Sequence, residues 1–424
     1  METWTAGDTR ALVLHPDLQN DAARRAPEAS LEEAVALAAA LPRLEVAGGE
    51  VVRVARPDAG RLFGKGKIAE IAKRVEEDEI ELVLIDGPVS PVQQRNLERE
   101  WKTKLLDRTG LILEIFSDRA RTREGVLQVE MAALSYQRTR LVRAWTHLER
   151  QRGGLGFVGG PGETQIEADR RAIDEQLTRL KRQLSKVVKT RGLHRAARAK
   201  VPYPVVALVG YTNAGKSTLF NRMTGADVLS KDMLFATLDP TMRKVELEGG
   251  LEVIMSDTVG FISDLPTQLV AAFRATLEEV LSADLILHVR DIAHPESEVQ
   301  AEDVQNILTE LGTNEDVPML EVWNKMDLMD GEPRLAALNR ADREEAVHPV
   351  SALTGEGIPS LIDAIGKALE GTRFEEVLTL GPADGRRRAW LYERGLVQSE
   401  DQDGTETRVG VRWGTVEKAR FDGL

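Results

Sequence analysis

Five short motifs in the centre of the chain combine residue types that can bind phosphate, a divalent metal ion and a purine base. In chain order they are Gly210-Tyr-Thr-Asn-Ala-Gly-Lys-Ser217, Thr237 within Phe-Ala-Thr-Leu-Asp, Asp257-Thr-Val-Gly260, Asn324-Lys-Met-Asp327 and Ser351-Ala-Leu353. The first motif follows an apolar run, which predicts a glycine-containing loop between a strand and a helix, where backbone N–H groups surround phosphate oxygens. In this order and at these spacings, the motifs predict a pocket for a guanine nucleotide and Mg²⁺.

The phosphate and metal chemistry divides among five of these residues. Lys216 is expected to reach the β- and γ-phosphates, and Ser217 to give Mg²⁺ an oxygen ligand. Thr237 would add a second direct metal ligand, Asp257 would hold the ion through water, and the Gly260 N–H would sense the γ-phosphate. We therefore predict Lys216, Thr237 and Gly260 as catalytic residues, and Ser217 and Thr237 as metal ligands.

The last two motifs favour guanine over adenine. A carboxylate at Asp327 can accept hydrogen bonds from both N1–H and the exocyclic amine of guanine, whereas adenine would leave it unpaired. The backbone at Ser351-Ala-Leu353 can present an N–H to the guanine carbonyl. The full set of predicted GTP-binding residues is Gly210, Tyr211, Thr212, Asn213, Ala214, Gly215, Lys216, Ser217, Thr218, Phe235, Ala236, Thr237, Leu238, Asp239, Asp257, Thr258, Val259, Gly260, Asn324, Lys325, Met326, Asp327, Ser351, Ala352 and Leu353.

Phe261 occupies the place where Ras-like enzymes carry a Gln that orients the attacking water. A phenyl ring can neither donate nor accept that hydrogen bond. We expect slow hydrolysis by the free protein and acceleration by a partner that supplies or orders the missing group. The alternative is that a more distant residue substitutes, in which case the basal rate would already be high.

Composition limits the class of protein. A chain of 424 residues suggests two or three domains, and 42% hydrophobic with 29% charged residues is typical of globular proteins. The sequence has no long uncharged apolar run that would predict a membrane span, and its first residues lack the pattern of a secretory signal. The absence of cysteine excludes disulfides, Cys-based zinc sites and thiol catalysis. We expect a cytoplasmic protein.

Strand and helix patterns alternate over the N-terminal region. Strands are predicted at residues 11–16, Val51–Ala55, Leu82–Ile85 and Leu111–Phe116, and helices at Leu31–Leu41, Ile68–Glu77 and Val92–Trp101. Ser30 is available as the N-cap of the first helix. This alternation predicts a small α/β domain with a largely parallel sheet over residues 1–120.

Residues 121–200 predict a basic helical hairpin. A long helix over residues 124–150 precedes a loop with six glycines among residues 153–162, and the following apolar residues have coiled-coil spacing: Ile166, Ile173, Leu177, Leu180, Leu184 and Val187. From Arg138 to Lys200 there are 16 Lys or Arg against six Asp or Glu, although the whole chain carries −13. This charge suggests contact with a polyanion, and a solvated helical face is the alternative.

The tip of this hairpin is the predicted RNA contact. The glycine loop is flanked by four arginines, which are Arg150, Arg152, Arg170 and Arg171. A flexible linker is the alternative, although Phe157 and Val158 within the loop are bulkier than a tether needs. The expected fold class is α/β: a GTP-binding domain over residues 201–372 follows the small α/β domain and the hairpin. A small α+β tail over 373–424 has β-like runs at Arg388–Tyr392 and Arg408–Trp413.

The motif set resembles the HflX family of translation-factor-type GTPases. Besides the nucleotide motifs, the resemblance rests on Asp257-Thr-Val-Gly-Phe-Ile-Ser-Asp-Leu-Pro, Leu106-Asp-Arg-Thr-Gly-Leu-Ile-Leu, Arg119-Ala-Arg-Thr-Arg-Glu-Gly and Gly159-Gly-Pro-Gly-Glu-Thr-Gln-Ile-Glu. It covers about residues 10–370, and the tail after residue 373 matches only loosely.

The resemblance implies GTP or GDP as ligand, Mg²⁺ as cofactor, and binding to the large ribosomal subunit and its RNA. It also implies splitting or rescue of stalled ribosomes, and use of ATP through the N-terminal domain. For ATP the nearest candidate is Gly64-Lys-Gly-Lys67, a short signal that also fits a basic turn. Two alternatives remain open: a nucleotide-gated scaffold for RNA or protein with little turnover, and an ATP-driven RNA remodeller.

Overall fold

The chain forms two compact units. The computed structural model describes residues 9–18, 25–151, 161–198, 203–226, 234–235, 241–247, 251–263, 279–314, 317–370, 374–403 and 406–422. The first unit comprises Met1–Val187, Lys231–Asp239 and Ser263–Thr276, and the second comprises Val188–Ser230, Pro240–Ile262 and Leu277–Leu424. Two short segments from the nucleotide-motif region therefore belong to the N-terminal unit.

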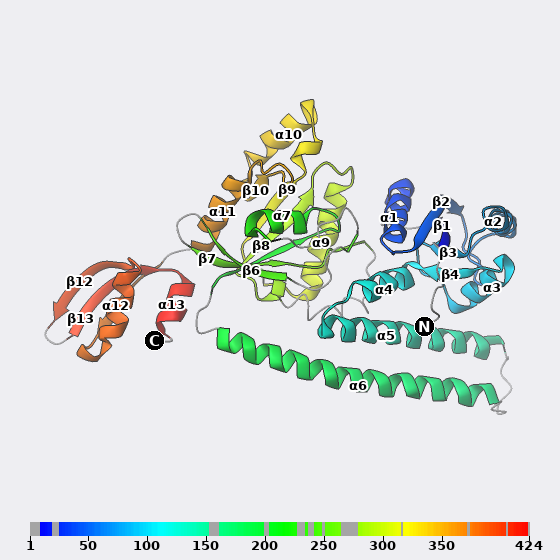
Figure 1. Cartoon of the computed structure of the whole chain (residues 1–424), viewed down its shortest axis with the longest axis horizontal. Coiled ribbons are helices and arrows are strands. Elements are labelled where there is room, and N and C mark those ends of the chain that lie inside the picture. The colour runs from blue at the N-terminus through cyan, green and yellow to red at the C-terminus, as the bar shows by residue number, and fades with distance from the viewer. Residues whose placement is uncertain are drawn as a thin grey trace. The chain divides into compact units, whose positions relative to one another are not determined.

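The first unit is built on a four-stranded parallel sheet in the order β2-β1-β3-β4 (Figure 1). Its strands are β1 (Thr9–Leu18), β2 (Leu44–Val54), β3 (Leu82–Ile85) and β4 (Lys104–Asp107). The helices are α1 (Pro27–Ala39), α2 (Lys65–Glu77), α3 (Pro91–Trp101) and α4 (Arg108–Arg119). Leu12 and Leu14 of the central strand pack with Ile71 of α2 and Leu97 of α3 in one buried cluster. The predicted parallel α/β arrangement is confirmed.

Two local predictions in this unit are wrong. The apolar run Leu111–Phe116 lies inside helix α4, and the last strand is the shorter β4 before it. Asp107 explains the error, because its side chain accepts a hydrogen bond from the Gly110 N–H and starts a helix at this point. Ser30 is not an N-cap, because α1 already begins at Pro27, a residue with a preset φ that favours the first helical turn.

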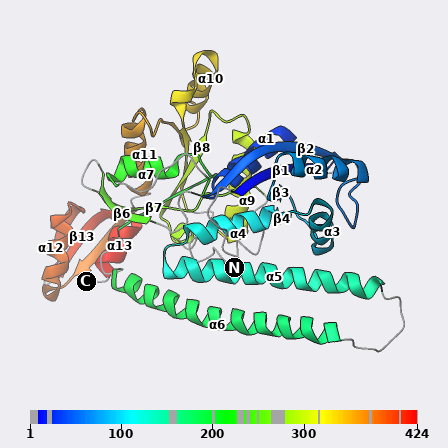
Figure 2. The same cartoon turned by 45° about the vertical axis from the view of Figure 1, so that its right-hand side comes forward.

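Two long helices follow. Helix α5 (Arg123–Gln151) and helix α6 (Pro161–Arg198) run side by side in opposite directions (Figures 1 and 2). Leu177 and Leu180 of the predicted seam are buried. Arg138 of α5 forms an ion pair of 3.0 Å with Asp174 of α6, so the two helices are in direct contact.

The second unit contains a six-stranded sheet in the order β10-β9-β8-β5-β7-β6, in which only β6 runs antiparallel to its neighbour. The strands are β5 (Val205–Gly210), β6 (Thr241–Glu246), β7 (Glu252–Asp257), β8 (Leu285–Asp291), β9 (Met319–Asn324) and β10 (Val347–Pro349). The helices of this part are α7 (Lys216–Thr224), α9 (Ser297–Leu311), the 3-10 turn η1 (Met326–Leu328), α10 (Gly331–Ala341) and α11 (Ile358–Glu370).

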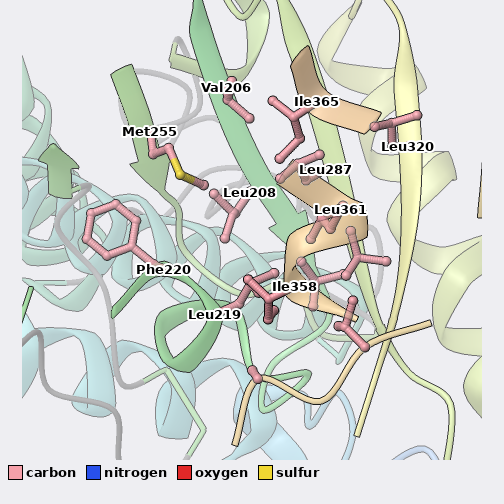
Figure 3. Close-up of a cluster of buried hydrophobic side chains, with 14 of the residues drawn as sticks. Val206, Leu208, Leu219, Phe220, Met255, Leu287, Leu320, Ile358, Leu361 and Ile365 are labelled. Atoms are coloured by element: carbon pink, nitrogen blue, oxygen red, sulfur yellow. The ribbon is translucent and has the colours of Figure 1, made fainter. Parts of the chain in front are cut away.

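One apolar face of this sheet fixes the helix that follows the phosphate loop. Leu219 and Phe220 of α7 and Leu361 of α11 pack against Leu208 and Leu287 of the two central strands (Figure 3). All five side chains are buried. The nucleotide motifs at the strand ends are therefore carried by a rigid, close-packed layer.

The tail forms a three-stranded antiparallel sheet in the order β11-β13-β12, with helices on it. Its elements are β11 (Phe374–Leu380), η2 (Pro382–Asp384), α12 (Gly385–Glu393), β12 (Val397–Asp403), β13 (Glu406–Trp413) and α13 (Thr415–Asp422). The α+β class is as predicted and Arg408–Trp413 lies in a strand. The β-like run Arg388–Tyr392 is wrong, because these residues belong to α12. Among the described residues, none of the helices has the length and apolar character that crossing a lipid bilayer requires.

Candidate GTP-binding site

The phosphate loop connects the end of β5 to the start of α7, and two glycines allow its shape. Gly215 has a φ of +90°, and a Cβ there would lie 2.2 Å from Nδ2 of Asn324. Gly210 has a φ of +153°, and a Cβ there would lie 2.2 Å from the carbonyl oxygen of Val289 in β8. Any larger residue at either position would collide with a neighbouring strand end, so the loop needs both glycines.

Lys216 is the buried cation of this loop. Its Nζ donates hydrogen bonds to the carbonyl oxygens of Gly210, at 3.0 Å, and Tyr211, at 2.6 Å. Burial lowers the pKa of Lys216 to about 8, although the carboxylate of Asp257 opposes the shift. A buried ammonium group that is bonded to neutral carbonyl oxygens is well suited to bind a phosphate oxygen, because the phosphate would place a negative charge next to it.

Ser217 and Asp257 meet at the end of β7. The Ser217 hydroxyl donates a hydrogen bond of 2.7 Å to a carboxylate oxygen of Asp257, and Asp257 is fully buried. Parallel pairing of β5 with β7 places this carboxylate beside the phosphate loop. Two oxygen-bearing side chains thus converge where the sequence predicts the metal, and oxygen ligands are those that Mg²⁺ prefers.

Phe261 packs into the protein and pairs its backbone with the phosphate loop. Its side chain is 2% exposed. The Phe261 N–H donates to the Gly210 carbonyl at 3.1 Å, and the Thr212 N–H donates to the Phe261 carbonyl at 2.7 Å. The adjacent Gly260 is held so close that a Cβ there would lie 3.0 Å from Nζ of Lys216. The position that carries a Gln in Ras-like enzymes is here part of the packed core.

Asn324 joins two of the predicted loops. Its Nδ2 donates to the Ala214 carbonyl at 2.8 Å, and its Oδ1 accepts from the Ala352 N–H at 2.9 Å. The side chain is 2% exposed. The amide group of Asn324 therefore holds the phosphate loop and the Ser351–Leu353 loop at a fixed separation.

Asp327 and Ser351 lie together, as the predicted base site requires. The Ser351 hydroxyl donates to a carboxylate oxygen of Asp327 at 2.5 Å and accepts from the Thr354 N–H at 3.1 Å. Asp327 lies in η1, which begins directly after the left-handed Lys325. The two base motifs come from different strand ends, β9 and β10, which are neighbours in the sheet.

Some predicted residues lie outside what the structure describes. Among the site residues these are Ala236, Thr237, Leu238 and Asp239, and at the hairpin tip Arg152. Phe235 is described: it is buried and belongs to the first unit. Arg150 lies near the end of α5, and Arg170 and Arg171 are exposed on α6.

Sequence reasoning missed two supporting contacts. Arg222 of α7 donates to the carbonyl oxygens of Ala352, at 3.2 Å, and of Leu353. Lys325 forms an ion pair of 2.8 Å with Asp291 at the end of β8. A helix residue five positions after Ser217 carries no sequence signal for a contact to a loop 130 residues later. Only the fold reveals it.

Four family profiles match the chain in sequence order. They are described as "GTP-binding GTPase N-terminal" (residues 28–117), "GTP-binding GTPase Middle Region" (119–198), "50S ribosome-binding GTPase" (205–325) and "HflX C-terminal domain" (336–422). Together they span most of the chain, including the tail for which the sequence resemblance was loose.

Similar proteins cover more than four fifths of the chain. A GTPase HflX of Magnetococcus marinus is 49% identical over 419 residues, which is 96% of this chain and 93% of that protein. The GTPase HflX of Escherichia coli is 47% identical over 82% of each chain, and that of Caldanaerobacter subterraneus is 43% identical over 84% of this chain and 82% of that protein. With a P-loop GTPase fold and these relatives, the chain belongs to the HflX family of GTPases and is a GTP hydrolase.

Proposed function

We propose that this GTPase is Mg²⁺-dependent, binds the large ribosomal subunit, and acts in splitting or rescue of stalled ribosomes, with hydrolysis stimulated by the ribosome. The observation that carries the proposal is the burial of Phe261, which leaves the phosphate site without the usual water-orienting side chain. The match to a profile described as a 50S ribosome-binding GTPase supports the choice of partner.

In this proposal the nucleotide is bound by the residues that the motifs predict. Lys216 would exchange its two carbonyl contacts for phosphate oxygens, and the loop N–H groups would surround the β-phosphate. Asp327 would accept from the guanine edge, with Ser351 fixing the orientation of its carboxylate. Asn324 would maintain the distance between the phosphate and base sites.

Ser217 and Asp257 fit the requirements of a magnesium site. Their side-chain oxygens already converge at 2.7 Å, and both are anchored at the ends of packed elements. We propose Ser217 and Thr237 as direct ligands and Asp257 as a ligand through water. When bound, Mg²⁺ would neutralise charge that develops on the phosphate oxygens during transfer.

Catalysis then needs a group that Phe261 cannot supply. Lys216 and the Gly260 N–H would stabilise negative charge on the γ-phosphate, but neither orders the attacking water. A ribosomal group that orders this water would complete the site. Hydrolysis would then occur mainly in the ribosome-bound protein, so the free protein would retain its GTP.

The hairpin is the proposed RNA-binding element. We propose the division into an N-terminal α/β domain (1–120), the hairpin (121–200), a GTP-binding domain (201–372) and a small C-terminal domain (373–424). The hairpin concentrates positive charge in a chain with a net charge of −13. Arg170 and Arg171 are exposed near the start of α6, where phosphate contacts would be made.

Cosedimentation with purified ribosomal subunits tests the proposal. The protein is incubated with large or small subunits and either a non-hydrolysable GTP analogue or GDP. We expect it to pellet with large subunits in the GTP-analogue form and to remain in the supernatant with GDP. Equal binding in both nucleotide forms, or binding only to small subunits, would contradict the proposal.

A further inference from the structure

Among the described residues, the loop Ser351–Glu356 after β10 has one backbone N–H group without an acceptor. Leu353 carries this group and is 70% exposed. The other N–H groups of the loop donate within the chain, from Ser351 to the Glu356 carbonyl at 2.9 Å, from Ala352 to Oδ1 of Asn324 at 2.9 Å, from Thr354 to the Ser351 hydroxyl at 3.1 Å, from Gly355 to the Ser351 carbonyl at 2.8 Å and from Glu356 to the Thr354 hydroxyl at 3.3 Å. The Leu353 N–H is therefore the donor of this loop that is available to a ligand.

Arg222 of α7 holds the peptide group that carries this donor. Its Nε donates to the Ala352 carbonyl at 3.2 Å, and the same guanidinium also donates to the Leu353 carbonyl. The Ala352 carbonyl and the Leu353 N–H belong to one planar peptide group and point in opposite directions. A contact on the carbonyl side therefore fixes the direction of the N–H. The positive charge also polarises the peptide group, which makes the N–H a stronger donor.

The place of Arg222 in its helix does not explain these contacts. A basic residue in the last turn of α7 is favoured by the helix dipole. That effect needs only a cation near the carbonyl groups of its own helix, whereas Arg222 donates to a loop 130 residues later. The guanidinium also lies against Gly355, where a Cβ would be 3.6 Å from Cζ of Arg222. None of the described carboxylates forms an ion pair with Arg222, so its partners are the backbone groups of this loop.

The same loop also holds the carboxylate that is predicted to bind guanine. The Ser351 hydroxyl donates to Asp327 at 2.5 Å, which brings an acceptor and the loop that carries the free donor together. Guanine has its 6-carbonyl next to N1–H on one edge, so it matches an acceptor beside a donor. Adenine has an amine at position 6, which would place two donors against each other.

We propose that Arg222 is a positioning residue for base specificity: it holds the Ala352–Leu353 peptide so that the Leu353 N–H donates to O6 of guanine. The inference rests on the proposed binding of guanine beside Asp327. Arg222 itself does not touch the base. The nucleotides that this arrangement selects are those of 6-oxopurines. Because α7 begins at the phosphate loop, one helix would connect the binding of phosphate with the reading of O6.

Three diphosphates separate the two edges of the base in the full-length protein. GDP is compared with 6-thio-GDP, in which sulfur, a weaker acceptor, replaces O6 while N1–H and the 2-amine remain. It is also compared with IDP, which keeps O6 and lacks the 2-amine that Asp327 would bind. Affinities are measured with Mg²⁺ by displacement of a fluorescent GDP.

The variants change only an exposed side chain. Arg222→Met removes every donor and keeps a good helix former of similar length, and Arg222→Lys keeps the charge without the planar fork. The matched control is Arg343→Met, which makes the same change at another exposed arginine, just after α10.

We expect the wild type to bind GDP about tenfold more tightly than 6-thio-GDP. Arg222→Met should lower GDP affinity by about five- to tenfold and reduce the preference over 6-thio-GDP to about twofold, because the O6 donor is no longer held in place. Its preference for GDP over IDP should stay within about twofold of wild type, since Asp327 is unchanged. Arg222→Lys should recover part of the lost preference, and Arg343→Met should match the wild type.

Equal losses for all three nucleotides in Arg222→Met would overturn the inference, because they would show that Arg222 only stabilises the loop. A wild type that binds GDP and 6-thio-GDP equally would overturn it as well. Asp327→Asn separates the inference from the proposed base site. If Asp327→Asn loses the preference for guanine while Arg222→Met keeps the preference for GDP over 6-thio-GDP, the base site stands and the role of Arg222 fails.

Discussion

At the scale of single residues, the predicted nucleotide site contains side chains that each make two hydrogen bonds. Asn324 satisfies one carbonyl and one N–H in separate loops, and Ser351 links Asp327 to the Thr354 N–H. We expect these contacts to preorganise the predicted base site, so that little ordering cost remains for binding.

Asp327→Asn is expected to reverse the base preference. An amide at this position offers N–H donors where the carboxylate offers only acceptors, so it matches the 2-carbonyl of xanthine rather than the 2-amine of guanine. GTP affinity should fall by about a hundredfold, corresponding to about 3 kcal/mol, and XTP should bind better than GTP. Competition between the two nucleotides, measured by fluorescence, gives the ratio.

The control for this change is Asp330→Asn, three residues further on, where the carboxylate precedes α10 and makes no capping hydrogen bond. It should leave the preference for GTP intact. Retained GTP selectivity in Asp327→Asn would show that another group reads the base.

Motif residues were predictable from sequence because their chemistry demands particular atoms at particular spacings. In this way the motifs predicted that the loop with Gly215 and Lys216 lies near Asn324, which the structure confirms, and the contacts of these residues with nucleotide stay predictions. The contact of Arg222 with Ala352 could not be predicted, because 130 residues separate the two and neither belongs to a motif whose chemistry names the other. Phe261 lies between these cases. The sequence already showed that its ring cannot orient water, but only the structure showed that the ring is buried against the phosphate loop.

At the scale of elements, the apolar pattern of a segment and the helix cap before it can favour different secondary structures. The run Leu111–Phe116 is apolar enough for a buried strand, yet the Asp107 cap makes it a helix. Residues Arg388–Tyr392 likewise became helix α12, because their apolar side packs on β13. In contrast, the helical pattern before the glycine loop was long enough to predict α5 within a residue at each end.

Strand β8 carries an unusual buried histidine, which leads to a prediction about pH. His288 is 1% exposed, and burial lowers its pKa to about 4, with Arg290 and Lys216 adding to the shift and Glu321 opposing it. The folded state keeps the ring neutral, whereas the unfolded state has an ordinary pKa of about 6.5. Between these two values the unfolded state binds more protons, so stability falls as pH falls from about 6.5 to about 4, by up to about 3 kcal/mol.

Histidine-selective NMR measures the pKa of His288 directly, and the chain has only six histidines, so the signals can be assigned. The signals that disappear in His288→Gln should titrate with a midpoint near pH 4. His294→Gln is the control, since His294 lies in a surface turn and its Nδ1 accepts from the Glu296 N–H. A midpoint between pH 6 and 7 for His288 would contradict the prediction.

At the scale of the whole molecule, we propose that nucleotide chemistry and RNA contact belong to different parts of the chain. The positive charge of the hairpin contrasts with the net charge of −13. Charge-dominated contact with RNA phosphates depends steeply on salt, because binding releases counterions.

Reversing the charge near the tip should therefore weaken ribosome binding. Arg170→Glu together with Arg171→Glu is expected to lower the affinity for large subunits by about tenfold or more and to flatten its dependence on salt. The matched control is Arg179→Glu with Arg182→Glu, which makes the same change to exposed residues further along α6. Equal effects of the two pairs would show that the tip has no special role.

We propose that the ribosome completes an active site in which Phe261 provides no water-orienting group. The most direct measurement is the single-turnover rate of GTP hydrolysis by the full-length protein, alone and with saturating large ribosomal subunits. We expect slow hydrolysis by the protein alone and an acceleration of at least about a hundredfold with large subunits, comparable in kind to completion of a GTPase site by a partner. A high rate without ribosomes that large subunits leave unchanged would contradict it.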